Sequence, residues 1–92
     1  MIRVVNIKRQ AADIYIGRGS RWGNPFKIGV HGDRNAVIEQ YAQYLESNLE
    51  LVDELRAQVN AVLAEGAIDC TLGCFCAPAP CHGDVLIDYL YR

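Results

Sequence analysis

The sequence has no long apolar run, no leader segment and no large excess of charge of either sign. Its 92 residues carry 9 Lys and Arg against 11 Asp and Glu, and 51% of them are hydrophobic. A membrane-spanning helix needs about 20 consecutive apolar residues, and disordered chains combine low hydrophobicity with high net charge. Neither pattern is present, nor does a charged segment followed by an apolar one open the chain. We therefore expect residues 1–92 to form a single soluble, cytoplasmic domain with no membrane partner.

The small net charge of −2 conceals two regions of opposite charge. Residues 1–34 carry seven Arg and Lys and two Asp, a net charge of +5, whereas residues 35–92 carry two Arg and nine Asp and Glu, a net charge of −7. This split argues against a protein that binds a nucleic-acid duplex through a uniformly basic surface. It allows a local binding site for an anion in the N-terminal third.

Cysteine is absent from residues 1–69. All four cysteines lie within the next twelve residues, at Cys70, Cys74, Cys76 and Cys81. A disulfide scaffold spreads its bridges along the chain. The cluster therefore predicts reduced thiols that are core residues, metal ligands or chemical groups of a site.

Short β-rich segments predict a small sheet. Residues 2–7 and 13–17 have the composition of strands, and residues 26–30 are expected to return briefly as a third. A later strand is expected over residues 67–76. Residues 77–81 contain two prolines, each of which biases the residue before it to an extended backbone, so this segment is not helical.

Two amphipathic helices are expected before the last strand, and a third after it. Apolar residues recur three and four positions apart beyond Asp33, a favourable N-cap. The S-x-x-E pattern of residues 47–50 predicts a capping box that starts the second helix, which Gly66 ends. The third helix is expected over residues 82–92. The element order β-β-(β)-α-α-β-α predicts a small single-domain α/β fold, in which a sheet carries a helical hairpin and a C-terminal helix.

The loop RGSRWGNPF, residues 18–26, has the composition of a ligand-binding segment. Glycine lets backbone N–H groups approach a ligand closely, and arginine offers a planar fork to phosphate or carboxylate. Its glycine spacing matches neither the dinucleotide fingerprint nor the P-loop. The structural alternative is a tight turn with solvated arginines and a tryptophan that plugs the core. The ligand-binding residues predicted here are Arg18, Gly19, Ser20, Trp22 and Asn24.

The segment LGCFCAPAPCHGD, residues 72–84, places thiols, an imidazole and a carboxylate between a strand and a helix. Ligands bind at the carboxyl ends of strands in open α/β sheets, and helix N-termini favour anions. A thiol at a helix N-terminus can have a lowered pKa and act as a nucleophile, while the imidazole or carboxylate does acid–base work. Cys76 is predicted to face the ligand. If the domain is an enzyme, the predicted catalytic residues are Cys81, His82 and Asp84.

Each of these residues also has a structural explanation. An acidic residue in a first helical turn stabilises the helix dipole, and free cysteine is among the most buried residue types. A third possibility is a metal, because three thiols and an imidazole can form a tetrahedral zinc site. Their C-x-C-x4-C-H spacing differs from the usual C-x2-C pairing. The metal ligands of this alternative hypothesis are Cys74, Cys76, Cys81 and His82.

The two segments together resemble a known family. RGS-x-WGNPF, then GDR at the start of a tyrosine-rich helix, and then LGCFCAPAPCHGDVL are similar to domain of unknown function 4326, a family of small proteins of bacteria and their viruses. The resemblance extends from about Val5 to Leu90. It implies a bacterial or phage-infected cell as the setting and a site formed by both segments, and it implies no particular activity, substrate or cofactor.

Three functional hypotheses follow. In the first, the domain binds a nucleotide-like or other phosphorylated ligand between the two segments, with or without enzymatic activity on it. In the second, zinc stabilises a protein-interaction module. In the third, the domain is a phage or host-defence accessory protein that binds a partner protein through its acidic helices, although solvated helix faces also explain such charges.

Overall fold

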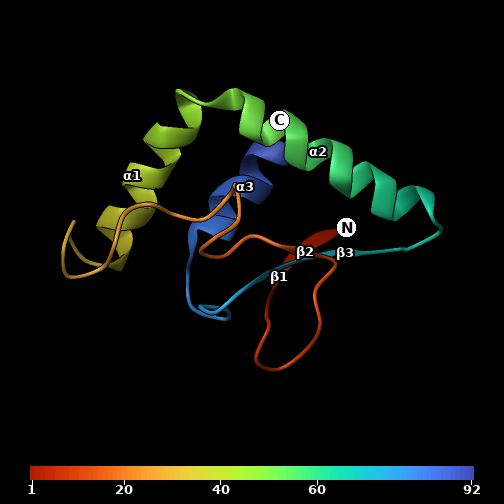
Figure 1. Ribbon diagram of the computed structural model, residues 1–92, viewed down its shortest axis with the longest axis horizontal. Helices are drawn as coiled ribbons and strands as arrows, with labels where there is room; N and C mark the ends of the chain where they lie inside the picture. The colour runs from red at the N-terminus through yellow and green to blue at the C-terminus, as the bar shows by residue number, and fades with distance from the viewer.

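A computed structural model describes residues 1–92. Its elements are β1 (Ile2–Asn6), β2 (Ile14–Tyr15), α1 (Arg34–Glu46), α2 (Leu49–Ala64), β3 (Cys70–Cys74) and α3 (His82–Leu90). The strands form one parallel sheet in the order β1-β3-β2. The predicted α/β class is confirmed, with the helical hairpin α1–α2 and the C-terminal helix α3 lying on the same side of the sheet in Figure 1. None of the helices is both long and apolar enough to cross a membrane.

The central strand β3 is buried on both faces. Its residues Cys70, Leu72 and Cys74 belong to the hydrophobic core beneath the helices. Alternate residues of a strand point to opposite faces, and on the other face the β1–β2 connection passes over Gly73. A Cβ atom at Gly73 would lie 2.5 Å from a methyl carbon of Ile7 and 2.6 Å from Cβ of Ala12. Glycine is therefore needed where this connection approaches the strand.

The strands are shorter than the sequence predicts. β2 has only two residues, where we expected residues 13–17, and β3 ends at Cys74 rather than at residue 76. A strand extends only as far as it has a partner, and β3 pairs with five residues of β1 and two of β2. The brief strand expected over residues 26–30 is wrong, because this segment forms turns.

The helix boundaries follow local capping in two of three predicted places. Asp33 caps α1 by accepting a hydrogen bond from the N–H of Ala36 at 2.9 Å, and Gly66 follows α2 with a φ of +98°. The capping box predicted for residues 47–50 is wrong. Ser47 instead ends α1, and Asn48 stands at the N-cap of α2 without a capping side-chain bond. Because Ser47 ends α1, the N-cap of α2 falls one residue later, on Asn48.

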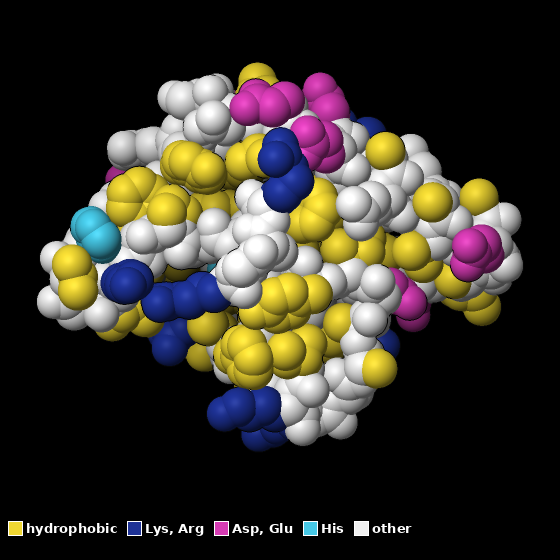
Figure 2. Space-filling view, in the orientation of Figure 1, with side chains coloured by type: hydrophobic (Ala, Val, Ile, Leu, Met, Phe, Trp, Pro, Cys, Tyr) yellow, Lys and Arg dark blue, Asp and Glu magenta, His cyan; other side chains and the backbone are white.

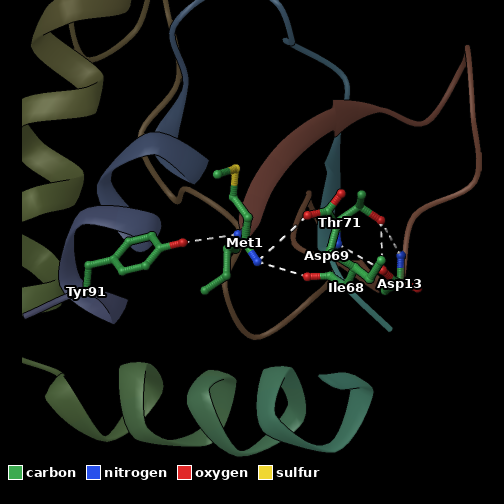
Figure 3. Close-up of polar contacts among 7 residues, drawn as sticks. Met1, Asp13, Ile68, Asp69, Thr71 and Tyr91 are labelled. Atoms are coloured by element: carbon green, nitrogen blue, oxygen red, sulfur yellow. Dashed lines mark hydrogen bonds and ion pairs between the residues drawn. The ribbon is translucent and has the colours of Figure 1, made fainter. Parts of the chain in front are cut away.

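Polar contacts at the amino edge of the sheet fix the start of the chain (Figure 3). The terminal amine of Met1 donates to the carbonyl of Ile68 at 3.0 Å and lies 3.7 Å from a carboxylate oxygen of Asp69. The Asp13 carboxylate accepts from the N–H and the hydroxyl of Thr71 at 2.9 and 3.1 Å. These contacts occupy the amino edge, whereas the two segments with the candidate residues leave the sheet at its carboxyl edge.

Candidate functional site

A cavity of about 290 Å³ lies at the carboxyl edge of the sheet. It is lined by 14 residues, drawn from segments 17–28, 34–38 and 74–82. Both predicted segments therefore contribute to one cavity, together with the first turns of α1. We call this space the cavity.

His82 forms part of the buried floor of the cavity. It is the first residue of α3, and its ring stands edge-on to that of Tyr41, with the centroids 5.1 Å apart. Its Nε2 atom lies 2.7 Å from the carbonyl oxygen of Ile16. A carbonyl can only accept a hydrogen bond, so Nε2 carries the proton in this pair.

The second ring nitrogen of His82 has no hydrogen-bond partner within the protein. Burial lowers the pKa of His82, and this effect outweighs the raising influence of the Ile16 carbonyl and of the Asp84 charge. The imidazole is therefore neutral at pH 7, with its lone pair on Nδ1. Nδ1 makes no hydrogen bond within the protein, and His82 is one of the residues that line the cavity.

Two thiols of the floor pair with each other. The sulfur atoms of Cys74 and Cys81 are 3.4 Å apart, and both cysteines are free and buried. Cys81 is also the N-cap of α3, where its sulfur accepts from the N–H of Gly83 at 3.3 Å.

The predicted lowering of the Cys81 pKa is wrong. The pKa of this thiol is raised to about 12: burial is the largest cause, Cys74 and the Asp84 charge add to it, and only the N–H of Gly83 lowers it. Desolvation of the thiolate thus outweighs the favourable helix terminus. Cys81 remains protonated at neutral pH, which removes the basis of its predicted role as a nucleophile.

The zinc ligands predicted at Cys74, Cys76, Cys81 and His82 do not assemble around a common point. No group of three or more His, Cys, Asp or Glu side chains is placed to hold a metal ion. Because β3 ends at Cys74, Cys76 does not continue the strand, and its N–H instead donates to the Cys74 sulfur at 3.4 Å. Cys76 is half-buried and lines the cavity.

Asp84, the third predicted catalytic residue, lies outside the cavity lining. Its carboxylate accepts from the N–H of Cys81 at 3.0 Å and so completes a capping box at the start of α3. This is the structural alternative that the sequence offered for an acidic residue in a first helical turn.

Trp22 is a core residue, which is the structural alternative that the sequence offered for it. The side chain is 6% exposed and does not line the cavity. Its indole N–H donates to the carbonyl of Leu51 at 2.9 Å, and its own carbonyl accepts from the Tyr41 hydroxyl at 2.6 Å. Trp22 therefore ties the first loop to both helices of the hairpin.

The other polar residues of the loop mainly hold its shape. The Ser20 hydroxyl donates to the carbonyl of Gly17 at 2.7 Å and closes a turn. Asn24 donates to the carbonyl of Val37 at 3.1 Å and accepts from the N–H of Phe26 at 2.9 Å. Asn24 lines the cavity, whereas Gly19 and Ser20 line a neighbouring hollow.

Two arginines give the cavity its charge. Arg18 is exposed, and its guanidinium makes no hydrogen bond or ion pair within the protein. Arg34 is half-buried and donates to the carbonyl of Pro80 at 3.0 Å. None of the 14 lining residues is acidic. In Figure 2 dark-blue basic side chains gather beside a hollow on the left of this face, while most of the magenta acidic ones lie at the top and right.

Arg34 and the apolar walls of the cavity were not predicted from the sequence. A signal for Arg34 exists, because a basic residue in the first turn of a helix opposes the helix dipole. Two large apolar residues of the lining, Ile28 and Phe75, are 53% and 52% exposed. Such exposure is visible only in the folded chain.

Comparison with known proteins agrees with the two sequence motifs. Residues 3–92 match the family described as domain of unknown function DUF4326. The chain belongs to this family.

Two viral proteins are similar to this DUF4326 chain. One is a 12.4 kDa protein of Enterobacteria phage T4 from the nrdA–td intergenic region, which is 31% identical over 100% of this chain and 80% of its own length. The other is a protein of Acanthamoeba polyphaga mimivirus, 31% identical over 97% of this chain and 78% of its own length. Both are described as uncharacterized. No solved structure matches the chain. The resemblance and the connection with bacteriophages are thus confirmed.

Proposed function

We propose that this DUF4326 domain binds a small phosphorylated, nucleotide-like ligand in the cavity between residues 17–28 and residues 74–82. The observation that carries the proposal is the composition of the cavity wall: it has two arginines and no acidic residue, and 8 of its 14 residues are hydrophobic. Such a wall suits a ligand with an anionic group and a flat, largely apolar body.

The arginines suit the phosphate. Arg18 has all its donors free, and Arg34 is held in place by the carbonyl of Pro80 while the rest of its guanidinium fork stays available. Charge-assisted hydrogen bonds to phosphate are about twice as strong as neutral ones. The apolar side chains of Phe26, Ile38 and Phe75 supply the contact area for a base.

His82 suits the base or sugar of the same ligand. Its Nδ1 has no partner within the protein and can accept a hydrogen bond from an N–H or O–H group. If the ligand is converted as well as bound, His82 is the residue that we expect to take up the proton, because it is neutral and its ring is held by the Ile16 carbonyl.

The acidic residues of the C-terminal part give no specific support to the hypothesis of a partner protein bound through the helices. Of the nine acidic residues after position 34, five already have partners within the protein. Four form ion pairs and one caps a helix; these are Asp53, Glu54, Asp69, Asp88 and Asp84.

Isothermal titration calorimetry against a panel of nucleotides and sugar phosphates tests the proposal. We expect at least one compound to bind, and we expect Arg18→Gln and Arg34→Gln each to weaken it by about tenfold or more, since a hydrogen bond to a charged group contributes about 1.5–3 kcal/mol. Arg3→Gln is the matched control, because Arg3 is exposed and lies outside the cavity lining. Wild-type affinity in both cavity variants would contradict the proposal, as would a panel without any ligand.

A further inference from the structure

A second hollow adjoins the cavity along the first loop. Its volume is about 310 Å³, and all of its seven lining residues come from segment 18–27. We call it the loop hollow. Arg18 and Asn24 line both spaces, so the cavity and the loop hollow meet at these side chains.

The side chains of the loop hollow favour an anion. Arg18 and Lys27 supply two positive charges, and no acidic residue lines the space. Neither cation forms an ion pair within the protein. The other arginine of the loop, Arg21, is different, because Glu54 neutralises it at the protein surface.

The backbone of the loop hollow adds unused donors. The N–H groups of Arg18, Gly19 and Asn24 donate no hydrogen bond within the protein, whereas those of Ser20 and Gly23 close turns of the loop. Gly19 has a φ of +90° and leaves its side-chain position empty. Successive free N–H groups at a left-handed residue are typical of anion-binding concavities.

We propose that the loop hollow binds the outer phosphates of a nucleoside polyphosphate whose nucleoside lies in the cavity. This inference rests on the proposed function and extends it, since it names the ligand class. Arg34 and Arg18 face the first phosphate at the cavity, and Arg18 and Lys27 continue the positive charge along the loop to the later ones. A monophosphate would leave Lys27 and the free N–H groups without a partner.

The test compares phosphate number in one nucleoside. AMP, ADP and ATP, and GMP, GDP and GTP, are titrated into the wild-type protein without added divalent cation. For the base that binds, we expect the triphosphate to bind about tenfold or more tightly than the monophosphate, because charge-assisted hydrogen bonds form in the loop hollow. Lys27→Gln should reduce this gain and should change the affinity for the monophosphate much less than that for the triphosphate. Arg34→Gln should lower the affinity for the monophosphate, diphosphate and triphosphate by a similar factor.

A control variant and three outcomes distinguish a failure of this inference from a failure of the proposed function. Arg3→Gln removes one positive charge outside both spaces, and we expect it to retain the full gain from monophosphate to triphosphate. Equal affinities for monophosphate and triphosphate, or the same loss of gain in Arg3→Gln, would overturn the inference while the nucleotide site stands. Inorganic tripolyphosphate that binds as tightly as the nucleoside triphosphate would overturn the nucleoside part. If no nucleotide binds the wild-type protein, the proposed function fails as well.

Discussion

The floor and the rim of the cavity use their polar groups in opposite ways. On the floor, Cys74, Cys81 and His82 are buried, and each is hydrogen-bonded to another group of the protein. On the rim, where the cavity meets the loop hollow, Arg18 and Lys27 are exposed, and neither charge has a partner. The floor therefore contributes mainly to the stability of the fold, whereas the rim retains its donors for a ligand. Sequence proximity does not decide the division, since buried Trp22 lies four residues from Arg18.

The largest expected effect tests that division within the first loop itself. Trp22→Ala removes a buried ring that packs in the core and bonds to Leu51. We expect the free energy of unfolding to fall by about 3–5 kcal/mol, as for other aromatic truncations in cores. Denaturant titration followed by circular dichroism measures the change, because the variant lacks the single tryptophan. Trp22→Phe, which keeps most of the apolar volume, should lose clearly less. A loss below about 1 kcal/mol in Trp22→Ala would place the ring with the rim.

An intermediate effect is expected on the floor, at His82. His82→Leu replaces the buried imidazole with an apolar side chain and leaves the carbonyl of Ile16 without its donor, which costs about 1–3 kcal/mol at pH 7. The cost should also depend on pH. Burial lowers the pKa of His82 in the folded protein below its unfolded value of about 6.5. The unfolded chain therefore takes up the proton first as the pH falls, and the folded protein loses stability below about pH 6.5.

Unfolding experiments at pH 7 and pH 5 on the wild-type protein and on His82→Leu measure this dependence. The difference between the wild type and His82→Leu isolates the histidine, because all other titrating groups are shared. We expect the advantage of the wild type to shrink at pH 5. An advantage that stays constant or grows with acid would mean that the imidazole is charged in the folded protein, and His82 would then belong with the cationic rim.

Local sequence patterns predicted the helices, the strands and the position of the candidate site better than they predicted the roles of single residues. The α/β class and the Asp33 cap follow from periodicity and capping, which depend on near neighbours. The meeting of both segments also follows simply, because parallel strands end at the same edge of the sheet and each segment comes directly after a strand. The role of Trp22 depends instead on Leu51, 29 positions away, and the orientation of Arg34 on the carbonyl of Pro80, 46 positions away. Such contacts form only when the whole chain packs.

The pKa of Cys81 illustrates why the chemistry was harder to predict than the fold. A helix N-terminus and burial act on a thiol in opposite directions, and the sequence shows only the first. The helix terminus is visible in the C-H-G-D pattern, but the depth of burial depends on how β3, α3 and the first loop pack together. The thiol is 3% exposed, so desolvation dominates.

The smallest expected effect on stability lies at the rim, and it gives the sharpest contrast with ligand binding. Arg18→Gln removes an exposed guanidinium with no partner, so the free energy of unfolding should change by no more than about 0.5 kcal/mol. The same change should nevertheless lower the affinity for the proposed ligand.

Arg21→Gln is the matched control in the same loop. It breaks the ion pair with Glu54, but Arg21 lies outside the cavity and the loop hollow, so the ligand affinity should be retained. Denaturant titration and calorimetry on both variants measure the two quantities. A loss of affinity in both variants would mean that the loop responds to charge as a whole. A loss in Arg18→Gln alone would mean that unpaired donors at the rim, and not basic residues in general, mark the binding surface.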